Sequence, residues 1–247
     1  MSMNTYLGPN FTKHVLAVFL ASVTLLTQAG TIEDIASIKS KLESRTPPLK
    51  AKSIKLSPID SLYEVYVEGN LIYADKSFSY AIVNGAMLET ISKKNLTEES
   101  LNQLTTIKFT DLPLQNAIEI KKGSGAYKFA VFSDPDCPYC KSLETGLAKS
   151  GVTDYTAYIF LFPLKNLHPD ATAKSESIWC AKDKTEAWSN LMLKGTVPEK
   201  ASCDNPLASN EKLAEEIGVY GTPTIYLSNG GKIQTPQELV AGIKAKK

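Results

Sequence analysis

The sequence YKFAVFSDPDCPYC occupies residues 127–140 and joins an apolar run to a C-x-x-C motif. The run 127–132 predicts a strand, and Pro138 suits the first turn of a following helix, because a proline there loses no hydrogen bond. Free N–H groups and the positive end of the helix dipole would stabilise a thiolate on Cys137. The motif therefore predicts thiol–disulfide exchange, with Cys137 as the nucleophile and Cys140 as the resolving thiol.

Two other interpretations of this cysteine pair are a structural disulfide and half of a zinc site. Zinc normally takes a second C-x-x-C pair or nearby histidines as ligands. The other cysteines, Cys180 and Cys203, are far apart in the sequence, and His168 is the only histidine after residue 29. We therefore expect neither a metal nor a cofactor.

Composition narrows the class of protein further. The chain has 247 residues, of which 43% are hydrophobic and 21% charged, so a wholly disordered chain is excluded and two domains are allowed. The formal net charge of +1 provides no basic field for a phosphate backbone, which argues against a nucleic-acid partner.

The first 29 residues have the pattern of a secretory signal peptide. They contain one charged residue, Lys13, followed by a mostly apolar run over 15–26 and small residues up to Ala29. The alternative is a permanent membrane anchor, but the run is shorter than the ~20 residues that a membrane-spanning helix needs, so a cleaved signal peptide is favoured. Cleavage after Ala29 would leave a mature chain without net charge and without membrane insertion. The signal peptide also predicts export to an oxidising compartment, where disulfides persist.

Residues 30–95 predict a small α+β domain. Its expected elements are a helix over 31–45, strands over 62–68, 71–74 and 78–83, and a turn at Gly69-Asn70. A sheet this small often pairs with a second copy at an edge, which predicts a homodimer. A helix-like stretch with Thr97 as its N-cap follows, and we interpret 96–112 as a linker helix.

Residues 113–247 predict an α/β domain with helices on both faces of a central sheet. The expected strands cover 116–121, 127–132, 155–162, 224–227 and 232–234, with helices after Cys140, within 170–217 and at the end of the chain.

Several residues outside the C-x-x-C motif have more than one interpretation. Pro223 precedes a strand, where a trans turn proline is the default; a cis Thr222–Pro223 bond would give a tight functional corner. In an oxidising compartment Cys180 and Cys203 would form a structural disulfide, the alternative being two free buried thiols.

Three polar residues near the motif or in a later loop also need an interpretation. Asp134 and Asp136 could relay a proton to Cys140 or serve as turn and cap residues. His168 reads as a loop residue before a helix capped by Asp170.

The chain resembles the periplasmic thiol:disulfide interchange proteins of the DsbC/DsbG type, within the thioredoxin superfamily. The residues that carry the resemblance are Phe132-Ser133-Asp134 before the C-x-x-C motif, 179–184 (WCAKDK), Ser202-Cys203-Asp204, Gly221-Thr222-Pro223-Thr224 and 227–230 (LSNG). It implies a thioredoxin-like C-terminal domain with a helical insertion, and a cystatin-like N-terminal domain that forms the homodimer. Pro138-Tyr139 resembles the DsbG branch, whereas the pair Cys180/Cys203 matches DsbC.

The resemblance also implies the reaction and its partners. The clients would be unfolded or misoxidised secreted proteins, bound at Tyr139 and at the Thr222-Pro223 loop as an added strand. A membrane thiol reductant of the DsbD type would keep the dithiol reduced. We expect a protein disulfide isomerase and reductase; the alternatives are a dithiol oxidase and a holdase chaperone with secondary redox activity.

Overall fold

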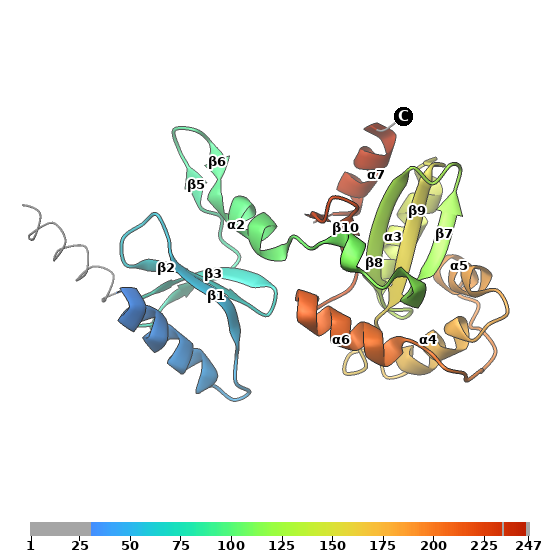
Figure 1. Cartoon of the computed structure of the whole chain (residues 1–247), viewed down its shortest axis with the longest axis horizontal. Helices are drawn as coiled ribbons and strands as arrows, with labels where there is room; N and C mark the ends of the chain where they lie inside the picture. The colour runs from blue at the N-terminus through green and yellow to red at the C-terminus, as the bar shows by residue number, and fades with distance from the viewer. Residues whose placement is uncertain (1–30, 234, 246–247) are drawn as a thin grey trace, which may run out of the picture. The chain divides into compact units, whose positions relative to one another are not determined.

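The computed structural model describes residues 31–233 and 235–245, which divide into two compact units after Met87 (Figure 1). The predicted signal peptide, residues 1–29, lies outside this described part of the chain. Across the residues that are described, no helix is long and apolar enough to cross a membrane.

The first unit packs one helix, residues 31–43, against an antiparallel sheet. Ile38 and Leu42 lie one turn apart on the buried face of the helix and contact Tyr63, Val65 and Ile72 of the sheet. The strands, in their order across the sheet, are β1 (Ala51–Leu56), β2 (Leu62–Val67), β3 (Asn70–Asp75) and β4 (Ala81–Ile82).

Three details of this unit differ from the sequence prediction. The strand predicted over 78–83 is only two residues long, Ala81–Ile82. The turn between β2 and β3 is formed by Glu68 and Gly69, not by Gly69 and Asn70; their φ angles of 47° and 81° are the left-handed values that a tight hairpin turn requires. β1 was not predicted, because its side chains are exposed or only half-buried and show no apolar alternation.

The second unit opens with a hairpin that leads directly into α2. The side-chain oxygen of Asn95 accepts a hydrogen bond from the Glu98 N–H at 3.1 Å, so the N-cap is Asn95 and the prediction of Thr97 is wrong. The α-helix ends at Thr105, well before the predicted end of the linker helix at residue 112. The elements are β5 (Leu88–Glu89), β6 (Lys94–Asn95), α2 (Leu96–Thr105) and the 3₁₀ turns η1 (Phe109–Asp111) and η2 (Leu114–Asn116).

A five-stranded mixed sheet forms the centre of this unit, with strand order β11-β10-β8-β9-β7. The central pair β8 and β9 is parallel, and the other neighbours are antiparallel. The strands are β7 (Ile118–Lys122), β8 (Tyr127–Ser133), β9 (Tyr155–Leu161), β10 (Thr224–Leu227) and β11 (Lys232–Ile233). Because β8 and β9 are buried along nearly their whole length, they read as continuous apolar runs rather than alternating ones.

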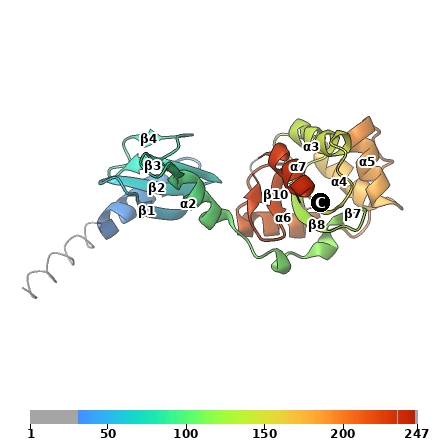
Figure 2. The same ribbon diagram turned by 90° about the horizontal axis from the view of Figure 1, so that it is seen from above.

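Helices cover both faces of this sheet (Figure 1 and Figure 2). On one face Leu143, Trp188 and Leu239 of α3, α5 and α7 join a single core; on the other, Ala214 of α6 packs with Phe109 of η1. The helices are α3 (Pro138–Lys149), α4 (Ala171–Trp179), α5 (Lys184–Lys194), α6 (Leu207–Ile217) and α7 (Pro236–Ala245). The predicted α/β layering of this unit is thus present.

Candidate active site

The C-x-x-C motif lies where the central strand β8 ends and α3 begins. β8 ends at Ser133, and Cys137 is the N-cap of α3, with Pro138 at the first helical position. The Cys137 N–H donates to the Asp134 carbonyl at 3.2 Å, which closes the turn between strand and helix. The nucleophile predicted from the sequence therefore lies at the positive end of a helix of 12 residues.

The loop before β10 meets this turn from the neighbouring strand. Thr224 of β10 pairs with Phe132 of β8, so the residues ahead of β10 lie beside the end of β8. The Thr222–Pro223 bond is cis, and the Cys137 Sγ donates to the Thr222 carbonyl across 3.3 Å. The structure thus brings together Cys137 and Thr222, which are 85 residues apart in the sequence.

The two thiols of the motif differ in their surroundings, although both are free. Cys140 has no exposed surface, whereas Cys137 retains 4% of its surface. Burial raises the pKa of the Cys140 thiol to about 12, and the hydrogen bonds with Ser133 and Thr222 offset this only in part. Cys140 is therefore a protonated thiol at neutral pH.

Tyr139 lies between the two cysteines and is 73% exposed. Two other large apolar side chains are exposed close in sequence to His168 and to Thr222: Leu167 is 71% exposed and Tyr220 49%. Leu167 and Tyr220 also line one pocket of about 380 Å³, together with Phe162, Leu164 and Val219. The pocket also has charged residues, Lys165, Glu211 and Glu215, in its lining, and its exposed apolar residue Tyr220 lies two residues before Thr222.

The two aspartates of the turn have partners other than Cys140. The Asp134 carboxylate is completely buried, accepts hydrogen bonds from backbone N–H groups and lies within hydrogen-bond distance of the His168 ring. The Asp136 carboxylate pairs with Lys174 at 2.6 Å. Turn and anchoring roles are thus the ones the geometry supports, and neither side chain has a hydrogen bond with the Cys140 thiol among those found.

His168 has a contact that the sequence did not reveal. It lies in the loop before α4 as predicted, but the Asp170 side chain makes no capping hydrogen bond to that helix. Instead, the His168 Nδ1 lies 3.0 Å from the Asp134 Oδ2. These residues are 34 positions apart, and no local motif could have indicated the contact.

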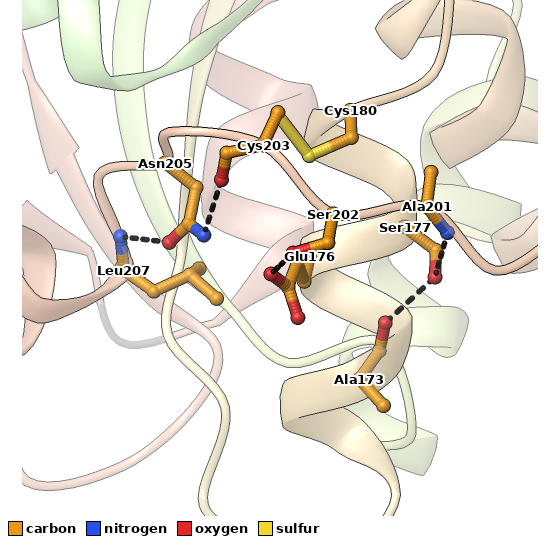
Figure 3. Close-up of a disulfide and its surroundings, with 9 residues drawn as sticks. All are labelled: Ala173, Glu176, Ser177, Cys180, Ala201, Ser202, Cys203, Asn205 and Leu207. Carbon is orange, nitrogen blue, oxygen red and sulfur yellow. Dashed lines mark hydrogen bonds between the residues drawn. A yellow bond between two sulfur atoms is a disulfide. The ribbon is translucent and has the colours of Figure 1, made fainter.

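Cys180 and Cys203 form a disulfide with Cα atoms 5.7 Å apart (Figure 3). Cys180 is the C-cap of α4 and is half-buried, and Cys203 lies exposed in the loop between α5 and α6. The bond ties the loop to the end of α4, far in sequence from the C-x-x-C motif.

Comparison with known proteins agrees with this architecture in both units. The family model of the disulfide bond isomerase protein N-terminal domain matches residues 29–98, and the model of the thioredoxin-like domain matches residues 114–241. A probable thiol:disulfide interchange protein DsbC of Bordetella parapertussis is 32% identical over 197 residues, which are 80% of this chain and 68% of the relative. The chain belongs to the DsbC family.

One further relative matches over more of the chain, and one solved structure is also similar. The thiol:disulfide interchange protein DsbC of Escherichia coli K12 is 29% identical over 231 residues, covering 91% of this chain and 92% of the relative. A crystal structure of a disulfide interchange protein from Neisseria gonorrhoeae is 42% identical, covers 55% of this chain and 97% of that one, and has a TM-score of 0.51. The predicted resemblance and the thioredoxin-like fold class are confirmed.

Proposed function

We propose that this DsbC-family chain is a protein disulfide isomerase and reductase whose reactive groups are Cys137 and Cys140. The observation that carries the proposal is the asymmetric dithiol: Cys137 at the N-cap of α3 beside the Thr222 carbonyl, and Cys140 buried as a thiol. A helix N-terminus favours the thiolate, which is the attacking species in disulfide exchange.

The reaction begins when the Cys137 thiolate attacks one sulfur of a client disulfide. A bond forms between that sulfur and Cys137, and the other client sulfur leaves as a thiolate. In isomerisation this thiolate attacks a second client disulfide and releases another client thiolate. A client thiolate then attacks the client sulfur bonded to Cys137, which forms a new client disulfide and releases Cys137 as the thiolate, without net oxidation. In reduction the Cys140 sulfur attacks the Cys137 sulfur and breaks its bond to the client, which leaves as a thiolate. The proton of Cys140 passes to this thiolate or to solvent, so the client leaves reduced and Cys137 and Cys140 become a disulfide.

We propose that the client chain binds along the Thr222-Pro223 loop. An extended chain can pair with the backbone of such a loop as an added strand. The exposed apolar side chains of Tyr139, Leu167 and Tyr220 support contact with unfolded clients, which expose apolar groups of their own.

An isomerase and a dithiol oxidase differ in the redox state in which the cell keeps the pair. For the isomerase we expect Cys137 and Cys140 to be mostly reduced in the periplasm, maintained by a membrane thiol reductant of the DsbD type. Trapping thiols with an alkylating agent in acid-quenched cells, followed by mass measurement, gives the reduced fraction directly. A mostly oxidised pair would instead assign the oxidase role.

We propose that a domain of residues 30–95 forms a homodimer, with residues 96–112 as the linker to the catalytic domain at 113–247. Exposed apolar residues lie in and on either side of the short edge strand β4: Tyr80 is 83% exposed, Ile82 56% and Val83 58%. Such an edge favours pairing with a second copy. Light scattering of the mature chain at micromolar concentration should give twice the chain mass, and a monomeric mass would refute the dimer.

The proposal also includes the signal peptide and the cellular compartment. We propose that residues 1–29 direct the chain to the periplasm and are removed there. An oxidising compartment agrees with the disulfide between Cys180 and Cys203.

A further inference from the structure

Asp134 is a buried carboxylate with four hydrogen-bond donors around it. Its Oδ1 accepts from the N–H groups of Asp136 at 2.7 Å and Cys137 at 3.2 Å. Its Oδ2 accepts from the N–H of Leu164 at 2.7 Å and lies 3.0 Å from the Nδ1 of His168. One carboxylate thus joins the turn before α3 to the loop after β9.

The proton of the His168 contact must lie on the histidine. Three backbone donors point at the Asp134 oxygens, and this arrangement suits an ionised carboxylate, which only accepts. His168 is therefore the donor through Nδ1, and its side chain keeps 23% of its surface exposed. The charge on the neighbouring Asp136 is already paired with Lys174, at 2.6 Å. Within the part of the chain that the structure describes, His168 is the one basic side chain within salt-bridge distance of Asp134.

The Asp134 carboxylate lies next to Cys137, so its charge affects the stability of a thiolate on that residue. Its Oδ1 binds the N–H of Cys137 itself, at the helix end whose positive potential stabilises a thiolate there. A buried negative charge at this place opposes a second negative charge on the Cys137 sulfur, because the interior screens charges weakly. A hydrogen bond from His168 to the Oδ2 of Asp134 reduces this repulsion between the carboxylate and the thiolate.

We propose that His168 is a positioning residue for disulfide exchange: it donates to Asp134, offsets the carboxylate charge and so favours the thiolate of Cys137. The inference rests on the proposed function, in which Cys137 is the attacking thiol. The oxidised pair carries no thiolate, so the effect falls on the reduced form alone. Favouring the thiolate stabilises the reduced form and makes the pair more oxidising.

Opposite substitutions should therefore shift the redox equilibrium in opposite directions. His168→Ala removes the donor and leaves the carboxylate charge, so the equilibrium constant for oxidation of the dithiol by glutathione disulfide should rise about tenfold, or about 30 mV. Asp134→Asn keeps an acceptor for the turn but removes the charge, so the same constant should fall by about the same factor. In His168→Asn the amide N–H can replace the Nδ1 donor, and most of the wild-type value should return.

The experiment equilibrates each full mature chain with glutathione buffers and measures the reduced fraction of Cys137 and Cys140 by alkylation and mass. Lys165→Ala is the matched control, because it removes an exposed cation paired with Glu211 from the same loop, and it should change the constant less than twofold. In an Asp134→Asn background, His168→Ala should have little further effect, since its action passes through Asp134. Circular dichroism checks that each variant is folded.

Two results would overturn the inference: a shift in the same direction for His168→Ala and Asp134→Asn, or a shift below twofold for His168→Ala. If Asp134→Asn does not fold, the other three variants, His168→Ala, His168→Asn and Lys165→Ala, still test the inference. A merely structural role for His168 predicts no change in the equilibrium constant for oxidation by glutathione disulfide in any of them. Failure of the proposed function has a different signature, namely a wild-type pair that does not equilibrate with glutathione at all.

Discussion

Cys137→Ala should reduce the recovery of native disulfides in a scrambled multi-disulfide client to the uncatalysed rate in the same glutathione buffer. The expected loss is on the order of 100-fold or more, because every productive step begins with a covalent bond between client and nucleophile. Cys140 cannot substitute for it, since that thiol is fully buried and burial raises its pKa to about 12. Recovery is measured as regained client activity over time.

Cys140→Ala is the matched control for this experiment. It keeps the attacking thiol but removes the group that releases a trapped client, so mixed disulfides with Cys137 should accumulate. Reduction should be lost, whereas part of the isomerisation should remain, because a client thiol can still release the enzyme. Undiminished recovery with Cys137→Ala would refute the assignment of the nucleophile and leave client binding as the source of any activity.

The sequence predicted those parts of the site that depend on local chemistry. The C-x-x-C motif, with Pro138 after an apolar run, identified both the helix start and the two thiols, because a strand–turn–helix junction is encoded within about ten residues. Tyr139 and the Thr222-Pro223 loop were assigned to one client-binding site only through the family resemblance. Spacing alone does not bring together residues that are 85 positions apart.

Other features were missed because tertiary packing decides them. Asp134 and His168 contact each other only because β9 runs parallel to β8 and returns its loop to the end of that strand. The N-cap of α2 was assigned to Thr97, two residues late, since both Asn95 and Thr97 have side chains that can cap a helix. β1 is an edge strand without apolar alternation, so its pairing with β2 left no pattern in the sequence.

Removing the disulfide between Cys180 and Cys203 should lower the free energy of unfolding of the second unit by about 3 kcal/mol. The two cysteines are 23 positions apart, and closing a loop of this length restricts the unfolded chain by about that amount. Few other contacts hold the loop to α4: the Ser202 hydroxyl donates to Glu176 at 2.6 Å, and the Ala201 N–H donates to Ser177 at 3.4 Å (Figure 3).

The measurement compares Cys180→Ala/Cys203→Ala with its parent in a Cys137→Ala/Cys140→Ala background, so that one bond changes. Both tryptophans of the chain, Trp179 and Trp188, belong to the second unit, so their fluorescence during urea unfolding reports on that unit. Trypsin cleavage after the exposed Lys200 should also become faster, because the loop is no longer fixed to α4.

Ser202→Ala is the matched control, since it removes one exposed hydrogen bond of the same loop and should cost less than about 1 kcal/mol. Placed in the chain with an intact C-x-x-C motif, the double replacement should leave disulfide exchange at Cys137 unchanged, because the bond lies outside the turn and the Thr222 loop. A loss of stability no larger than that of Ser202→Ala, with no change in trypsin cleavage, would show that the bond does not stabilise the loop. Loss of exchange in a variant that remains folded would instead show that the helical insertion supports the C-x-x-C turn directly.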